Sequence, residues 1–80
     1  MPRYFFDVRD GDGTFVDDLG VVLPDMETAK REARKALSDM VRDALRQDAA
    51  EALSIAIRDG MDGPVVLTVT MTTQMPPRRA

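Results

Sequence analysis

The sequence predicts a two-layer α+β domain in which a four-stranded antiparallel sheet carries one long helix on one face. Three observations lead to this prediction. Apolar and polar residues alternate on both sides of a Gly-containing break at 59–63, and apolar residues recur every three or four positions from Met26 to Leu45. A further alternating segment at the N-terminus runs into an Asp-Gly-Asp-Gly turn. Alternation indicates a strand with one buried face, and the longer period indicates a helix.

The first two strands are predicted on either side of the turn at 10–13. In the first strand, at 3–9, Tyr4, Phe6 and Val8 point to one face, and Phe5 falls among the charged residues of the other. Asp and Gly tolerate positive φ, so a tight turn returns the chain into a second strand at 14–23. This strand is expected to be broken at 17–20, with a bulge or turn at Gly20.

A long helix is predicted to begin at Pro24 and Asp25. Pro cannot continue a strand ladder, and the Asp25 carboxylate can accept hydrogen bonds from the N–H groups of the first helical turn. No Gly is present to cap the other end, and we expect the helix to end between Gln47 and Glu51. Its apolar stripe contains Met26, Ala29, Ala33, Ala36, Leu37, Met40, Val41, Ala44 and Leu45.

The last two strands form the clearest hairpin. Residues predicted to face the helix are Leu53, Ile55 and Ile57 in one strand and Val65, Leu67, Val69 and Met71 in the other. The element order ββαββ with a right-handed crossover gives the sheet order 2-1-3-4, with all neighbours antiparallel. Residues 1–73 are expected to form a single domain, and 74–80, which show no periodicity, a flexible C-terminal tail.

Composition narrows the class of protein. With 80 residues, 44% hydrophobic and 31% charged, the chain is typical of one small globular domain. No apolar run approaches the roughly 20 residues that cross a bilayer, and the first residues lack the pattern of a cleavable signal. The absence of Cys and His removes thiolate sites, the commonest metal ligand and the usual general base. We expect a cytoplasmic protein with no cofactor, no membrane contact and no small-molecule ligand.

Carboxylates gather around the first hairpin, at Asp7, Asp10, Asp12, Asp17 and Asp18. Loops rich in oxygen ligands hold calcium, but a calcium loop starting at Asp10 would need Gly and a bidentate acid where this chain has Phe15 and Val21. Turn chemistry accounts for these Asp and Gly residues. Carboxyl groups at a hairpin tip are solvated, whereas acid–base catalysis needs a raised pKa. We therefore expect no metal site and no enzymatic activity.

Basic residues gather on the helix face opposite the apolar stripe, at Lys30, Arg31, Arg34, Lys35, Arg42 and Arg46. A basic stripe can bind phosphates, which makes nucleic-acid binding the alternative function. The net charge of -3, the pI near 4.7 and the acidic residues interspersed on the helix favour a solvated surface instead.

The sheet face away from the helix is predicted to be the interaction surface. It presents Phe5, Ala56, Val66 and Thr68, an apolar area near the size at which an exposed patch indicates a partner. Residues of this kind are also routine on an open antiparallel sheet. Our first hypothesis is a non-enzymatic protein-interaction module that forms a homodimer or binds a small protein, through a sheet face or an edge strand.

Several segments carry a resemblance to known proteins. A family of short uncharacterised proteins common in rhizobia and related bacteria is similar to this chain in three features: the opening Met-Pro-Arg-Tyr-Phe-Phe, the Asp10-Gly11 turn, and the run from Asp18 to Asp25 before an Ala-rich helix. That resemblance implies a bacterial protein and assigns no catalytic residue. The second strand and the helix are also distantly similar to HicB-like antitoxin domains, which implies a module able to cover a protein partner.

Overall fold

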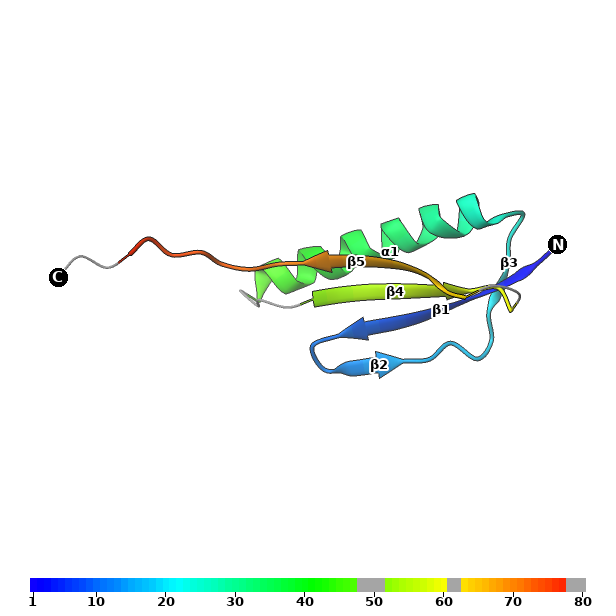
Figure 1. Cartoon of the computed structure of the whole chain (residues 1–80), viewed down its shortest axis with the longest axis horizontal. Coiled ribbons are helices and arrows are strands. Elements are labelled where there is room, and N and C mark those ends of the chain that lie inside the picture. Colours follow the sequence, from blue (N-terminus) through cyan, green and yellow to red (C-terminus); the bar gives the residue numbers. More distant parts are fainter. Residues whose placement is uncertain (48–51, 61–62, 78–80) are drawn as a thin grey trace.

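The computed structural model describes residues 1–47, 52–60 and 63–77. Within these residues the fold is α+β, with one helix on a five-stranded antiparallel sheet (Figure 1), which confirms the predicted class. In chain order the elements are β1 (Arg3–Asp10), β2 (Gly13–Phe15), β3 (Val21–Val22), α1 (Met26–Arg46), β4 (Ala52–Arg58) and β5 (Val65–Thr70).

The sheet has the order β2-β1-β4-β5, with β3 pairing to β1 off this path. The predicted count of four strands is wrong, because the expected second strand at 14–23 is two short strands that pair with the two ends of β1. Between them the Phe6 N–H donates to the Asp17 carboxylate at 3.1 Å. A side chain thus accepts the bond that the backbone of a continuous strand would have accepted.

Gly20 lies in the break between β2 and β3. Its φ of +73° is in the left-handed region, and a Cβ at this position would lie 2.8 Å from Arg3 Cγ and 2.9 Å from Phe5 Cε1. Both the backbone and the close neighbours therefore favour Gly. This positive φ agrees with the bulge or turn that the sequence predicts at Gly20.

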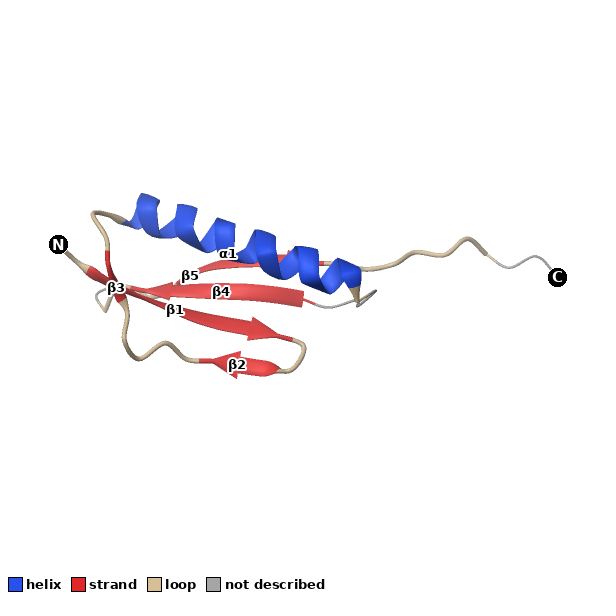
Figure 2. Ribbon diagram, turned by 180° about the vertical axis from the view of Figure 1, so that it is seen from behind, coloured by secondary structure: helices blue, strands red, loops and turns tan. Residues whose placement is uncertain are grey.

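Helix α1 begins at the predicted cap. The Asp25 carboxylate accepts hydrogen bonds from the Thr28 N–H at 2.8 Å and the Thr28 hydroxyl at 2.7 Å. The helix ends at Arg46, and the Gln47 N–H donates to the Asp43 carbonyl at 3.2 Å. In both ribbon views α1 runs along β4 and β5 on one side of the sheet (Figure 2), and these are the strands that it contacts.

The core lies between α1 and the sheet. Its buried residues are Tyr4, Ala29, Ala33, Leu37, Ala44, Leu53, Ile55 and Ile57. Small Ala side chains on α1 let the helix approach the larger aliphatic side chains of β4 closely. Ala36 and Leu45, which the periodicity assigned to the apolar stripe, are exposed, with 64% of Leu45 accessible. The covered stripe is therefore narrower than the one that the sequence suggested, and its main contacts are with β4 and β5.

Several predicted features fall outside the described residues. These are the helix extension at 48–51, part of the second hairpin turn at 61–62, and Arg78 with Arg79. Residues 71–77 follow β5 without forming a helix or strand. In the described part of the chain, no helix has the length and apolar character that spanning a membrane requires.

Candidate interaction surface

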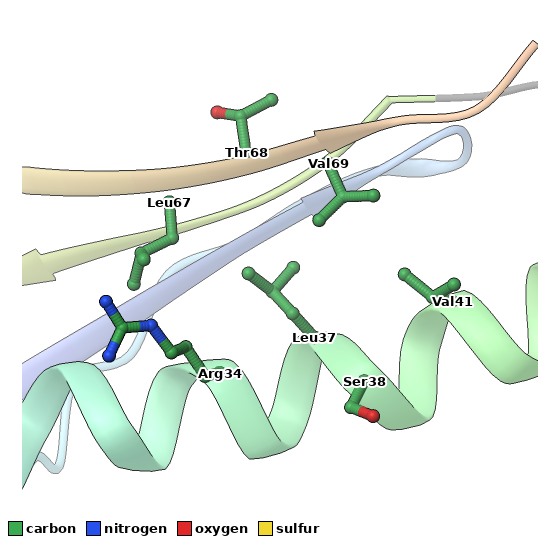
Figure 3. A pocket seen from close by; sticks show the side chains of 7 residues that line it. All are labelled: Arg34, Leu37, Ser38, Val41, Leu67, Thr68 and Val69. Carbon is green, nitrogen blue, oxygen red and sulfur yellow. The ribbon is translucent and has the colours of Figure 1, made fainter.

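An open, mainly apolar groove of about 380 Å³ separates α1 from β5. Leu37 and Val41 line it from the helix, and Leu67 and Val69 from the strand. Figure 3 shows these four side chains pointing into the space between the two elements, with Arg34 reaching from the helix toward Leu67. Thr68 points away from the helix in the same view. The groove exists because α1 lies over β4 and β5 and leaves the outer side of β5 uncovered.

Strand β5 is the last strand on this side of the sheet. It pairs with β4 without interruption from Val65 to Thr70, and no other described strand pairs with its outer edge. Its sequence, Val-Val-Leu-Thr-Val-Thr, has no charged residue and no Pro. Protein sheets commonly protect an edge strand with charge, Pro, a bulge or short length, because a free edge can pair with another chain. β5 uses none of these devices.

The opposite edge is protected. It consists of β2 and β3, which are only 3 and 2 residues long. The loop between them bonds to β1 through the carboxylates of Asp7 and Asp17 in place of a backbone ladder. Phe15, Val16 and Leu19 are well exposed here, at 67%, 62% and 78%. The broken backbone on this side offers no long ladder to a second chain.

The predicted interaction residues lie on the face away from α1, which we call the open face. Val66 is 54% exposed and Thr68 is exposed, whereas Phe5 and Ala56 are half-buried. Arg58 covers Phe5, with its guanidinium carbon 5.0 Å from the ring centre, and Gly20 approaches the ring edge. The structure therefore places Val66 and Thr68 together on β5 and leaves Phe5 under other groups.

A charged cluster of Asp7, Arg58 and Asp17 occupies the open face next to Phe5. Arg58 donates to the Asp7 carboxylate from Nε at 2.7 Å and from Nη2 at 3.1 Å, and Nη2 also donates to the Asp17 carbonyl at 2.9 Å. The Asp17 N–H donates to Asp7 at 3.0 Å. These groups bind each other, so the cluster joins β1, β4 and the loop after β2.

The pKa values of both acids respond to this cluster. Hydrogen bonds from Arg58 lower the pKa of Asp7, and backbone N–H groups of Gly20, Phe6 and Leu19 lower the pKa of Asp17. Both groups are held as carboxylates, whereas a general acid near neutral pH would need a raised pKa. We interpret the cluster as structural.

The basic residues of α1 are placed among acidic neighbours. Lys30 lies 2.7 Å from Glu27, Lys35 lies 3.4 Å from Glu32, and Arg42 lies 3.8 Å from Asp39. Each pair is spaced i,i+3 on the helix surface. Arg31 and Arg46 are exposed, and Arg34 lies at the α1–β5 groove. The six residues thus alternate with acids and do not form one unbroken basic surface.

Of the carboxylates around the first hairpin, Asp10 acts in the turn, whereas Asp7 pairs with Arg58, which the turn interpretation does not account for. Asp10 accepts from the N–H groups of Asp12 and Gly13, at 2.8 and 3.2 Å, as the turn interpretation expects. Asp10 and Asp12 also border a polar cavity together with Asp43. In the part of the chain that the structure describes, no group of three or more acidic side chains is arranged to hold a metal ion.

Comparison with known proteins identifies the family of this chain. The family described as a domain of unknown function, DUF6894, matches residues 3–72. The chain belongs to this family. The match runs from the first residue of β1 to two residues beyond β5, so the DUF6894 domain includes every strand and the helix described above. No curated protein and no solved structure matches the chain. This match confirms the expectation that the chain belongs to a family of small proteins whose function is not assigned.

Sequence reasoning missed the groove and the charged cluster. Alternation along β1 and β4 places Asp7 and Arg58 on the same face, which was a usable signal. The strand register, which pairs Phe5 with Arg58 and Asp7 with Ala56, then makes the two charged residues diagonal neighbours. The groove had no comparable signal, because it depends on where α1 lies across the sheet.

Proposed function

We propose that this DUF6894 domain is a non-enzymatic protein-interaction module that associates with itself through its sheet. The observation that supports the proposal is the long, uncharged outer edge of β5. An edge of this kind has backbone N–H and C=O groups ready to pair with another strand, and proteins that remain monomeric commonly protect such an edge.

The side chains near this edge support the same proposal. The groove between α1 and β5 is mainly apolar, and Leu45 on α1 and Val66 on β5 are both more than half exposed. Burying apolar side chains of this size stabilises a complex. A small domain also buries a limited share of its own surface, so self-association would add to a modest core.

Sedimentation equilibrium of the full chain at several concentrations tests the proposal. We expect the average mass to rise from that of one chain toward that of two as the concentration increases from about 5 to 500 µM, as mass action requires. A mass equal to one chain throughout this range would contradict self-association.

The alternative is an antitoxin-like or nucleic-acid-binding regulator that uses the basic face of α1. The feature that favours it is the exposure of Arg31 and Arg46 on that face. This function predicts affinity for a DNA or RNA duplex that falls steeply with salt, because binding releases counterions. Fluorescence anisotropy at low and high salt tests it, and an Arg31→Glu, Arg46→Glu variant should lose the binding. No binding at low salt would remove this alternative.

A further inference from the structure

We propose that two copies of this chain pair β5 against β5 in antiparallel orientation, about a two-fold axis beside Thr68. The two sheets then join into one, and the two α1 helices lie side by side on the same face. This inference rests on the proposed self-association and adds its geometry and its contact residues.

The position of the axis follows from the ends of β5. An antiparallel pair centred on Thr68 matches Val65 of one copy with Met71 of the other, so the ladder uses only residues with a backbone N–H. A pair centred on Leu67 would bring Pro64 into the ladder, and Pro has no N–H to donate. Centring on Thr68 therefore gives the longer ladder.

The side chains of β5 complement each other in this register. On the helix side Leu67 of one copy faces Val69 of the other, and these residues already line the groove. On the open face Thr68 meets Thr68, and Val66, which is 54% exposed, meets Thr70. Apolar pairs and Thr pairs directly opposite each other stabilise antiparallel strands. No like charges meet along the two strands, because β5 carries none.

The position of α1 suits the same dimer. Because α1 contacts β4 and β5, and strands lie about 4.8 Å apart, the two helix axes would be about 10 to 14 Å apart in the joined sheet. Helices in direct contact lie about 8 to 10 Å apart. The two α1 helices would therefore be slightly further apart than this, and long side chains can fill the space between them.

The residues available to fill that space lie on one side of α1. Arg34, Ser38 and Val41 line the groove, and Leu45 follows Val41 by one turn on the same side. Leu45 is 64% exposed in the single chain. The partner helix would cover this Leu in the dimer. That would explain why a large apolar side chain lies on an exposed part of α1.

A second copy suits this edge because it supplies a strand of matching length. β5 carries no charge and no Pro, so its own residues can continue the ladder on both sides of the axis. The Arg34 side chains of both copies would lie at the joined groove, and they can extend into solvent because Arg34 is exposed.

The experiment is sedimentation of the full chain carrying Thr68→Lys, with Thr70→Lys as the matched control. Both Thr residues are exposed on the same strand and the same face. Thr68→Lys places two ammonium groups opposite each other across the axis, and we expect the dimer dissociation constant to rise about tenfold or more. In Thr70→Lys the new side chain lies opposite Val66 of the other copy. The rise in the dimer dissociation constant should therefore be several times smaller than for Thr68→Lys.

A charge-reversal pair separates loss of the dimer from loss of the fold. Thr68→Glu alone should weaken the dimer to a similar extent, while an equal mixture of the Thr68→Lys and Thr68→Glu chains should form a tighter heterodimer, because opposite charges then meet at the axis. A second variant, Leu45→Ser, should weaken the dimer while far-UV circular dichroism stays unchanged.

The outcomes are distinct. Restoration of the dimer in the mixture, with the Thr70→Lys control close to the unaltered protein, supports the proposal. A dimer that resists both Thr68 substitutions, or one weakened equally by Thr68→Lys and Thr70→Lys, overturns this geometry and leaves self-association standing. A wild-type chain that is monomeric at all concentrations overturns both.

Discussion

Asp7 and Arg58 are 51 residues apart in the sequence and meet on the open face of the sheet in a two-point ion pair. The same guanidinium lies over Phe5 and reaches the Asp17 carbonyl. One side chain from β4 thereby fixes β1 and the loop that follows β2. This cluster fills one end of the open face, which leaves the β5 end as the accessible part of the sheet.

Asp17→Ala should destabilise the domain. The Asp17 carboxylate accepts the N–H groups of Phe6, Leu19 and Gly20, and the alanine variant leaves a part-buried donor on Phe6 without its partner. An unsatisfied donor of this kind costs about 1 to 3 kcal/mol. Chemical denaturation measures the change in the free energy of unfolding. Asp18→Ala is the matched control at an exposed neighbour, and an equal loss in both variants would contradict this role for Asp17.

Gly20→Ala should also destabilise the domain, for two separable reasons. The left-handed backbone costs a non-Gly residue about 1 to 2 kcal/mol, and the new Cβ would also press on Arg3 and Phe5. At Gly60, where φ is +85°, nothing lies within 4 Å of such a Cβ. Gly60→Ala should therefore show the backbone cost alone. Melting temperatures of the two variants make the comparison, and a larger loss for Gly60→Ala would refute the steric part.

Stability should fall below about pH 4. The pKa values of Asp7 and Asp17 are lowered in the folded protein, whereas an unfolded Asp titrates near pH 3.9. The folded state therefore gains stability from both carboxylates above that pH, and the gain is lost as the pH falls through their lower folded values. Urea denaturation between about pH 7 and 2 measures this dependence. An Asp7→Asn, Asp17→Asn variant should show a shallower fall, and an unchanged slope would argue against these two groups as its source.

Ile57→Ala tests the core between α1 and β4. Ile57 is fully buried, and removing a buried Ile side chain costs about 2 to 5 kcal/mol, a large share of the stability of a small domain. Leu19→Ala, at a position 78% exposed, should change the free energy of unfolding by less than about 0.5 kcal/mol. Thermal unfolding of both variants gives the comparison, and equal effects would show that the core lies elsewhere.

Much of the fold was predictable because local patterns specify it. Asp25 caps the helix as expected, and Leu53, Ile55 and Ile57 are buried as their alternation indicates. At 14–23 the predicted break at 17–20 is present, but the two segments beside it are separate strands, β2 and β3, so the count of strands differs from the prediction. The Asp17 carboxylate competes with the ladder there by accepting backbone N–H groups of its own loop and of β1.

The candidate surface was predictable only in part. Val66 and Thr68 were assigned to the open face from alternation. Both are exposed on β5, and Figure 3 shows Thr68 pointing away from α1. Phe5 was assigned to the same surface, yet Arg58 and Gly20 cover much of its ring. Which side chain shields another depends on which residues of neighbouring strands lie opposite each other, and alternation within one strand fixes the face of each residue but not its partner.

The sequence by itself determined the types of element, the helix start at Asp25 and the buried residues of β4, because propensity, capping and periodicity act over a few neighbouring residues. Only the tertiary structure decided that Asp7 meets Arg58 and that a groove lies beside Leu67. These depend on the strand order and on the position of α1 over two strands, which are set by packing between segments far apart in the chain.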